Sequence, residues 1–389
     1  MSVSDSSDAP GARPRIALTK GTLRIPPTYF AVQHALEMPD VDWRLLALAA
    51  AVDDPRISLP IDEAVPGAGV LPMRMREAMK WGFIGHYSSL IAHSGADLIH
   101  QHQATWSLPA LRASRRMRVP LLTTLHGGDA YASSLLPAPE RLIERAGSAW
   151  TERNLRAARE STRVLAVSRY LADVAVASGF DPSTLHVHYQ GVDTEWWCAD
   201  DEAGERGEIP SLLFVGALSD LKGVPDLLRA HASVSDRHRL VIVGDGPLRR
   251  DVERAAAGDP ALTYAGPLPR EGVRDAMRRS DALILPTRTT RGRAEAAGLV
   301  SLEAQACGLP VIVNDVGGAA EMSAPSCSDL LTREFDVDSL ASAMRAVIRM
   351  GASERRARGA ASREWVEANR STRTAVAELR VHYEELLGA

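Results

Sequence analysis

DALILPTRTTRGRAEAAGLVSLEAQACGLPVIVN, residues 281–314, contains the pattern that decides the fold. Short apolar runs at 281–287 and 309–314 have the length and composition of buried parallel strands. Between them a loop precedes a helical stretch that begins near Leu299 and stops at Gly308, a common helix-ending residue. A strand, a helix and a second strand in this order form the repeating unit of a parallel α/β sheet.

The same alternation extends over the whole chain. In the first half, the predicted strands are 15–19, 43–49, 96–100, 120–126, 163–168 and 185–189. In the second half, they are 211–216, 239–244, 262–266, 281–287 and 309–314. Amphipathic stretches such as 72–95 and 139–159 fill the intervals as helices. The sequence therefore predicts an α/β protein with two doubly wound parallel-sheet, Rossmann-like domains and an interdomain cleft, in which ligands bind beyond the carboxyl ends of the strands.

The length of 389 residues favours two domains over one. The stretch 196–210 is acidic and polar without apolar periodicity, which is typical of a linker. We predict five segments: a disordered tail at 1–13, an N-terminal domain at 14–195, the linker at 196–210, a C-terminal domain at 211–372, and a terminal helix at 373–389 that packs back on the N-terminal domain.

Composition excludes several classes of protein. Apolar residues make up 45% and charged residues 24%, as in ordinary globular proteins. The net charge of −4 gives no reason to expect a nucleic-acid partner. Three scattered cysteines argue against a disulfide framework, and no apolar run has the length of a membrane span. We expect a cytoplasmic protein; composition does not indicate its oligomeric state.

Two acidic residues bracket the start of the helix predicted near Leu299. Glu295 lies in the loop before it and Glu303 in its early turns. Positions 296–299 hold no Ser, Thr, Asp or Asn that could cap the helix, so its first N–H groups are available to an outside acceptor. A phosphate suits such a helix start, and carboxylates accept hydrogen bonds from sugar hydroxyls. The alternative is a helix start capped by water and flanked by ordinary surface glutamates.

The spacing E-x7-E, followed by AQACGLPVI and then GGxxE ending at Glu321, resembles the donor-site signature of glycosyltransferase family 4. These are retaining enzymes of the GT-B architecture, and the similarity runs from about residue 14 to 387, with the second half more specific. The resemblance implies that Glu295 contacts the donor sugar and Glu303 the nucleotide ribose. It also implies that the diphosphate is bound by the backbone of Gly298, Leu299 and Val300. By the same resemblance, 14–195 is the acceptor-side domain and 211–372 the nucleotide-sugar-binding domain.

A second segment, LLFVGALSDLKGVPDLLRA at 212–230, supports the resemblance. The family has a Gly-Arg…Lys-Gly loop whose two cations bind the diphosphate. Gly216 and Lys222 match that loop, whereas Ala217 stands where arginine is usual. Fixed cations are needed at a leaving diphosphate when no metal is bound, so another residue should supply the missing charge.

Lysine occurs only at Lys20, Lys80 and Lys222, against 42 arginines. We expect Lys20, together with Gly21 in a TKG loop after the first strand, to face the same cleft. Either Lys20 or Arg293 is then the candidate for the missing charge. The alternative is that Lys20 stands there by chance.

Two further loops follow predicted strands of the second half. VIVGDGPLRRDV contains Gly244 and Gly246, which permit a close approach of the backbone to a nucleotide. YAGPLP contains Pro267. A GxG pair alone is equally explained by turn chemistry, but the resemblance implies that both loops approach the base and ribose.

Histidines mark the strand ends of the first half. His126 follows a predicted strand in TTLHGGDAY, which resembles the family's His-Gly-x-Asp segment, whose histidine lies near the donor sugar. Asp129 is the only first-domain candidate for a covalent nucleophile, and it is also a candidate acceptor contact. His102, in HQHQ at 100–103, shares a strand face with His100 and is either an acceptor-side or a structural residue. No histidine or carboxylate cluster has convincing metal-ligand spacing.

The sequence therefore predicts a retaining, metal-independent hexosyltransferase without a cofactor, with His126, Glu295 and Lys222 at its catalytic centre. The donor is a nucleotide sugar, with UDP-sugar favoured, and the acceptor a hydroxyl of a soluble natural-product core or a growing saccharide. Basic stretches at 73–92 and 112–120 leave open a membrane-associated enzyme acting on a lipid-linked glycan; the alternative is a solvated helix face. A GT-B epimerase or phosphorylase and a non-catalytic nucleotide-sugar-binding subunit are the remaining alternatives.

Overall fold

The protein contains two parallel β-sheets. The computed structural model describes residues 13–25, 29–54, 56–132, 142–199 and 208–388. The first sheet has seven strands in the order β3-β2-β1-β4-β5-β6-β7. Its strands are β1 (Arg15–Ile25), β2 (Asp42–Val52), β3 (Ile61–Glu63), β4 (Leu98–His102), β5 (Leu121–Leu125), β6 (Arg163–Ala166) and β7 (Leu185–Val187).

The second sheet has six strands in the order β10-β9-β8-β11-β12-β13. Its strands are β8 (Ser211–Val215), β9 (Arg239–Val243), β10 (Leu262–Gly266), β11 (Ala282–Leu285), β12 (Val311–Asn314) and β13 (Leu331–Thr332). All neighbouring pairs in this sheet are parallel. The chain order reverses between β8 and β11, which creates the switch point where doubly wound sheets bind ligands.

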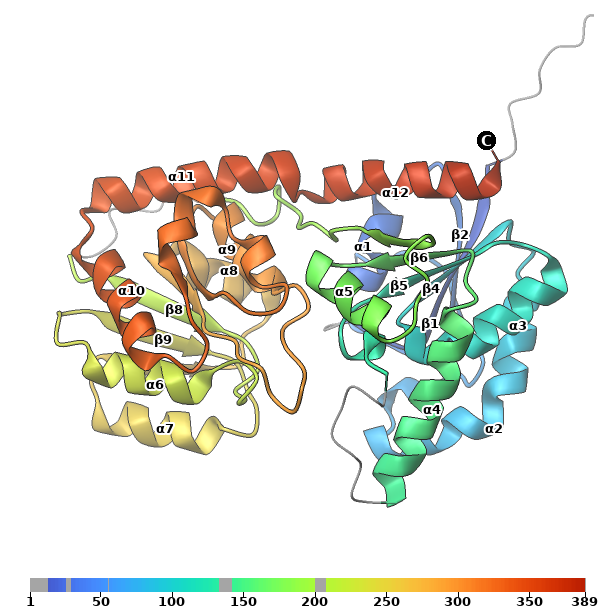
Figure 1. The fold of residues 1–389 in the computed structure, drawn as a ribbon, viewed down its shortest axis with the longest axis horizontal. Helices are drawn as coiled ribbons and strands as arrows, with labels where there is room; N and C mark the ends of the chain where they lie inside the picture. Colours follow the sequence, from blue (N-terminus) through green and yellow to red (C-terminus); the bar gives the residue numbers. More distant parts are fainter. Residues whose placement is uncertain (1–12, 26–28, 55, 133–141, 200–207, 389) are drawn as a thin grey trace, which may run out of the picture. The chain divides into compact units, whose positions relative to one another are not determined.

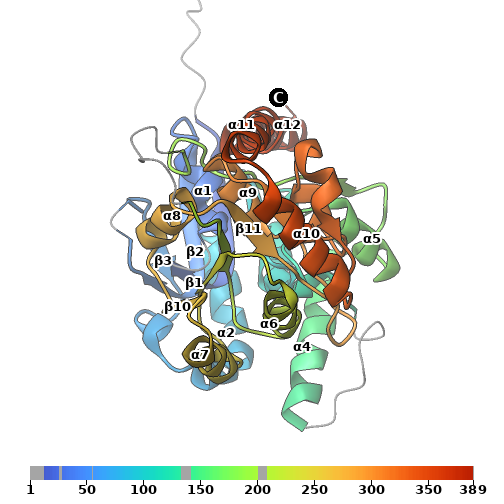
Figure 2. The same cartoon turned by 90° about the vertical axis from the view of Figure 1, so that its left-hand side faces the viewer.

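Helices connect the strands in both sheets. The helices associated with the first sheet are α1 (Phe30–Leu36), α2 (Met73–Ala92), α3 (Ser107–Met117), α4 (Leu142–Ala158) and α5 (Arg169–Ala177). Those that follow are α6 (Val224–Ser233), α7 (Arg249–Gly258), α8 (Arg270–Arg278), α9 (Leu299–Ala306), α10 (Val337–Arg349), α11 (Ala352–Asn369) and α12 (Thr372–Leu387). Around the second sheet, α6, α7 and α10 lie on one face and α8, α9 and α11 on the other (Figure 1). Figure 2 shows β11 between these two helix layers.

Contact density divides the chain into two units. Unit 1 comprises Met1–Thr124, Ala149–Val164 and Leu379–Ala389, and unit 2 comprises Leu125–Ser148 and Leu165–Glu378. The loop that follows β5 therefore belongs to the same unit as the entire second sheet.

The core of unit 1 packs α2, α3 and α4 against its sheet. Trp106 and Trp150 lie edge to face with ring centroids 5.2 Å apart, and Trp106 also meets the buried Tyr87. The last helix contributes to the same unit, because the hydroxyl of Tyr383 lies 2.6 Å from Nδ1 of His100. Arg380, one turn earlier, forms an ion pair with Asp40. Residues from the end of the chain thus complete the packing of unit 1.

The first strand corrects one prediction. Lys20 and Gly21 do not form a loop after the strand, because β1 continues to Ile25. Its partner β2 is equally long, so the backbone beyond Thr19 still pairs with β2 after pairing with β4 has ended. Lys20 is 2% exposed, and its Nζ donates to Oε1 of Gln103 at 2.6 Å.

The other predicted elements agree with the structure. A strand lies at each of the eleven predicted positions, and the predicted helices correspond to α2, α4 and α12, with residues 139–141 lying outside the described part. The predicted linker is only partly described, but Trp197 at its start is buried. Among the described residues, none of the helices combines the length and apolar character needed to cross a bilayer.

Candidate functional site

The best-defined polar contact at the predicted site joins Lys222 to Glu295. Lys222 lies in the loop between β8 and α6, and Glu295 in the loop between β11 and α9. Lys222 Nζ lies 2.5 Å from Oε2 of Glu295, and the two side chains are only 20% and 16% exposed. The structure thus brings together two residues that are 73 positions apart in the sequence.

The helix start beside Glu295 matches the sequence prediction. Helix α9 begins at Leu299, and Gly298 before it adopts a left-handed conformation with φ 71° and offers no side-chain cap. A Cβ atom at Gly298 would lie 2.9 Å from the buried Leu285, so glycine is needed there. The N–H groups of Leu299 and Val300 belong to the unpaired first turn that attracts anions.

Glu303 lies in the second turn of α9 and is half-buried. Burial raises its pKa to about 7, and the nearby Arg270 guanidinium opposes this shift. A carboxyl group with such a pKa readily changes between a hydrogen-bond donor and an acceptor near neutral pH.

Three glycine loops lie side by side at the carboxyl ends of β8, β9 and β10. A Cβ atom at Gly244 would lie 1.9 Å from the carbonyl oxygen of Gly216. One at Gly246 would lie 2.6 Å from the carbonyl oxygen of Leu218. Gly244 N also donates to the carbonyl of Gly266, directly before Pro267, at 3.0 Å. These glycines allow the predicted nucleotide loops to approach one another.

The turn after β5 is held by its own aspartate. The backbone N–H groups of His126 and Gly127 donate to Oδ1 of Asp129 at 3.0 and 2.7 Å. Nδ1 of His126 lies 3.1 Å from the amide nitrogen of Gln190 and therefore accepts a hydrogen bond. In the neutral imidazole, the proton is then on Nε2. The sequence did not predict the roles of Asp129 and Gln190 in fixing this turn and the histidine ring.

The His126 turn lies against the Glu295 loop within unit 2. A Cβ atom at Gly127 would lie 3.4 Å from Cβ of Ala296, and one at Gly128 would lie 3.3 Å from a guanidinium nitrogen of Arg293. Ser168 caps α5 and also donates to the carbonyl of Ala296 at 2.6 Å. The predicted catalytic histidine and the predicted sugar-binding glutamate thus come from adjoining loops.

Glu321, the last residue of the GGxxE motif, holds the neighbouring helix α5. Its carboxylate accepts from the backbone N–H groups of Arg169 and Tyr170, both at 2.9 Å, and from the hydroxyl of Tyr189 at 2.8 Å. Gly318 N donates to the carbonyl of Glu295 at 2.8 Å. The GGxxE motif therefore anchors α5 through Glu321 and the Glu295 loop through Gly318.

Three predicted site residues, Lys20, Gly21 and His102, lie in unit 1. A Cβ atom at Gly21 would lie 1.9 Å from the ring of Trp106, which gives this glycine a packing reason. His102 is buried and stacks on His100 with ring centroids 4.3 Å apart, so the two imidazoles share a face as expected. No group of three or more potential metal ligands occurs among the residues that the structure describes.

Comparisons with known proteins show which family this chain is similar to. Residues 31–196 match the family described as Glycosyltransferase Family 4, and residues 209–350 match the one described as Glycosyl transferases group 1. A GDP-mannose-dependent alpha-(1-6)-phosphatidylinositol monomannoside mannosyltransferase of Mycolicibacterium smegmatis is 30% identical over 78% of this chain and 87% of that protein. A D-inositol 3-phosphate glycosyltransferase of Kribbella flavida is 30% identical over 64% of this chain and 62% of that protein. The chain thus spans less than two thirds of the length of that relative.

Solved structures share the fold. Sucrose-phosphate synthase from Thermosynechococcus elongatus superimposes with a TM-score of 0.76 at 18% identity, covering 97% of this chain and 100% of that one. The Anabaena protein HepE in complex with UDP-glucose gives a TM-score of 0.73 at 15% identity, covering 95% and 99%. These matches confirm the predicted GT-B architecture. Together with the sequence matches to both halves, they show that the chain belongs to glycosyltransferase family 4.

Proposed function

We propose that this protein is a retaining, metal-independent hexosyltransferase that uses a nucleotide-sugar donor, with UDP-sugars favoured. The observation that carries the proposal is the Lys222–Glu295 ion pair beside the uncapped start of α9. A nucleoside diphosphate needs a cation and free N–H donors, and its sugar needs a hydrogen-bond acceptor. This small region of unit 2 supplies all of these groups.

In the proposed complex, Lys222 binds the diphosphate together with the N–H groups of Leu299 and Val300. Glu295 then accepts hydrogen bonds from hydroxyls of the donor sugar, and Glu303 from the ribose. The ammonium of Lys222 lies between the diphosphate and the carboxylate and offsets their repulsion. Arg293, which lies over the ring of Tyr131 at 5.8 Å, supplies the charge that Ala217 lacks.

Transfer proceeds on one face of the sugar. The bond between the anomeric carbon and the phosphate oxygen breaks, the acceptor oxygen bonds to the same face, and the departing phosphate oxygen takes the acceptor proton. Lys222 and the start of α9 stabilise the charge that develops on the leaving group. His126, held in one tautomer by Gln190, orients the donor sugar. Binding of Asp129 Oδ1 to two backbone N–H groups argues against a covalent route through that carboxylate.

Donor choice is tested by thermal shift with UDP-, GDP-, ADP- and dTDP-sugars in the presence of EDTA. The HepE complex contains UDP-glucose, whereas the mycobacterial relative is named for GDP-mannose, so both donor types belong in the screen. A donor at 100 times its dissociation constant stabilises the fold by about 2.7 kcal/mol. We expect one class of donor to raise Tm with EDTA present and Lys222→Ala to reduce that increase by about half. The absence of any shift would contradict the proposal.

The stereochemical part needs an acceptor. We propose a hydroxyl of a soluble natural-product core or a growing saccharide, and the first readout is slow release of free nucleotide from the donor alone. Once an acceptor is found, the anomeric coupling constant of the product in an NMR spectrum decides between retention and inversion. An α-configured donor should give an α-linked product.

One observation favours a second candidate, a peripheral membrane enzyme acting on a lipid-linked acceptor. Met75, Trp81 and Phe83 of α2 are 53%, 46% and 39% exposed. Large apolar side chains on one helix are typical of interfacial contacts, and the mycobacterial relative is named for a phosphatidylinositol derivative. Co-sedimentation with anionic liposomes that Trp81→Ala abolishes would support this candidate over a soluble acceptor.

A further inference from the structure

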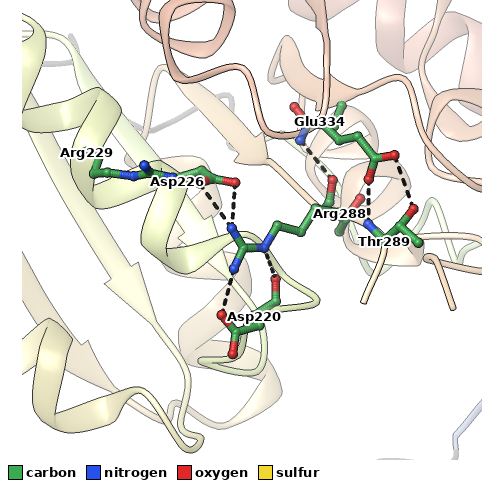
Figure 3. Close-up of polar contacts among 8 residues, drawn as sticks. Asp220, Asp226, Arg229, Arg288, Thr289 and Glu334 are labelled. Atoms are coloured by element: carbon green, nitrogen blue, oxygen red, sulfur yellow. Dashed lines mark hydrogen bonds and ion pairs between the residues drawn. The ribbon is translucent and has the colours of Figure 1, made fainter. Parts of the chain in front are cut away.

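Arg288 connects the end of β11 to the loop that carries Lys222. Its Nε donates to the carbonyl of Asp220 at 2.9 Å, and Nη2 donates to the carboxylate of the same residue at 2.7 Å (Figure 3). Nη1 lies 3.2 and 3.1 Å from the two carboxylate oxygens of Asp226, on the first turn of α6. The backbone N–H of Arg288 donates to the carbonyl of Leu221 at 2.9 Å.

These contacts differ from an ordinary surface ion pair. The side chains of Arg288 and Asp226 are 16% and 3% exposed, so water competes little for them. A planar guanidinium that donates in three directions fixes both the position and the orientation of its acceptors. Asp226 also pairs with Arg229, so its buried carboxylate keeps a cation when Arg288 is replaced.

The contacts hold the loop on both sides of Lys222. Asp220 and Leu221 precede the lysine, and Asp226 follows it. Gly223, directly after the lysine, packs so closely on the strand end that a Cβ atom would lie 1.7 Å from the carbonyl oxygen of Pro286. The four-carbon side chain of lysine is flexible, so the placement of its backbone decides which atoms Nζ can reach.

Arg288 is itself held from the other side. The next residue, Thr289, donates through its backbone N–H and its hydroxyl to the carboxylate of Glu334 at 2.6 and 3.2 Å (Figure 3). The guanidinium of Arg288 lies 5.4 Å from the ring centre of Phe335. Loops after β8, β11 and β13 are therefore joined through two adjacent residues.

We propose that Arg288 is a positioning residue that places Lys222 for the donor diphosphate; this inference rests on the proposed function. It touches neither the donor nor the reacting atoms and acts through the loop at 219–223. The position of Lys222 matters more for diphosphate binding here than in a loop with the family's usual arginine, because Ala217 provides no second cation.

A double-mutant cycle in the full-length protein tests the inference. The variants are Lys222→Ala, Arg288→Gln and the double variant. The probes are the nucleoside diphosphate that the wild type binds best among UDP, GDP, ADP and dTDP, and the corresponding monophosphate. We expect Lys222→Ala to weaken diphosphate binding about tenfold. Arg288→Gln should weaken it about fivefold when Lys222 is present and less than twofold when it is absent, with monophosphate binding unchanged.

Three further variants separate positioning from general stability. Arg288→Lys keeps a cation beside Asp226 but cannot donate to Asp220 at the same time, so it should preserve Tm and lose most of the diphosphate affinity that Arg288→Gln loses. Asp220→Asn, at an exposed position, should give a smaller loss that also disappears without Lys222, and it decides the question if Arg288→Gln fails to fold. Arg349→Gln removes an exposed ion pair with Asp236 in the same unit and should change nothing.

Equal losses for the diphosphate and the monophosphate would overturn the inference, as would equal losses with and without Lys222. Either result would leave the proposed function intact, since the wild type still binds the diphosphate. A wild type that binds none of the four diphosphates would contradict the proposed function itself, and this inference with it.

Discussion

Under the proposed function, Glu303 contributes to ribose binding at a cost to the stability of the fold. Its pKa of about 7 lies above the ordinary glutamate value of 4.5 because the carboxyl group is desolvated. The folded protein therefore binds this proton more tightly than the unfolded chain does. It follows that the free energy of unfolding decreases as pH rises from about 4.5 to about 7. In the proposed complex a ribose hydroxyl donates to the carboxylate form, so donor affinity should increase over the upper part of the same range.

Replacing Glu303 with glutamine should therefore have opposite effects on stability and binding. At pH 8 we expect the variant to be more stable than the wild type by about 1–3 kcal/mol, with no gain at pH 4.5. Diphosphate affinity at pH 8 should decrease about tenfold, because an uncharged amide is a weaker acceptor. Thermal unfolding and nucleotide titration between pH 4.5 and 8 measure both effects. Glu253→Gln, at an exposed ion pair on α7, is the matched control. If the difference in unfolding free energy between the wild type and Glu303→Gln did not change with pH, the raised pKa of Glu303 would be contradicted.

Arg293 is the second residue whose role can be isolated. Its guanidinium lies near Gly128 in the His126 turn, and Glu295 follows it two residues later in the sequence. If it supplies the charge that Ala217 lacks, Arg293→Gln should lower kcat about 10²-fold, the typical cost of one group that stabilises a leaving anion. Ala217→Arg in the same protein should restore part of that loss, because it returns a cation to the family's usual position. Steady-state rates of nucleotide release compare the variants. If Arg293→Gln caused no loss of rate and the added Ala217→Arg caused no gain, Arg293 would be excluded from the diphosphate site.

At the level of elements, the sequence predicted the features that depend on residues close together in the chain. The apolar runs that form the strands and the uncapped start of α9 at Leu299 were predictable because burial and capping depend on neighbouring residues. Strands β3 and β13 have three and two residues and carry no periodic pattern. The continuation of β1 past Thr19 depends on pairing with β2. Likewise, the contacts of Glu321 and Gln190 join residues 152 and 64 positions apart, which no local pattern reveals.

Strand β1 gives a prediction at this scale. Gly21 faces the buried ring of Trp106, and a Cβ atom would lie 1.9 Å from it. Gly21→Ala should therefore displace the tryptophan and destabilise the protein by about 1–3 kcal/mol. Gly82→Ala is the matched control: this glycine lies inside α2 with no atom within 4 Å of a new Cβ, so the change should be neutral or stabilise the helix by up to about 1 kcal/mol. Chemical denaturation of both variants measures the difference, and equal effects would refute the packing argument.

At the scale of the molecule, the residues assigned to the proposed chemistry are not spread over both units. Every group to which we assign diphosphate or sugar binding lies in unit 2. Unit 1 is assembled from three separate segments, the last being Leu379–Ala389. Leu379 and Tyr383 in that segment are 1% and 4% exposed. The end of the chain should therefore matter for the folding of unit 1 far more than for the groups that bind the nucleotide.

This division can be tested by ending the chain after Glu378. The truncation removes Tyr383, whose hydroxyl lies 2.6 Å from Nδ1 of His100, and Arg380, which is paired with Asp40. It also exposes the apolar surface that Leu379 and Tyr383 cover. Loss of two large buried side chains and a buried hydrogen bond costs several kcal/mol, roughly 2–5 for each core side chain.

In scanning calorimetry we expect the truncated protein to show an early transition that the bound nucleoside diphosphate does not shift, followed by one that it does. A chain ending at Leu387 should unfold like the full-length protein. If truncation after Glu378 instead lowered only the nucleotide-sensitive transition, the last helix would belong energetically to unit 2, and the division into units would be wrong.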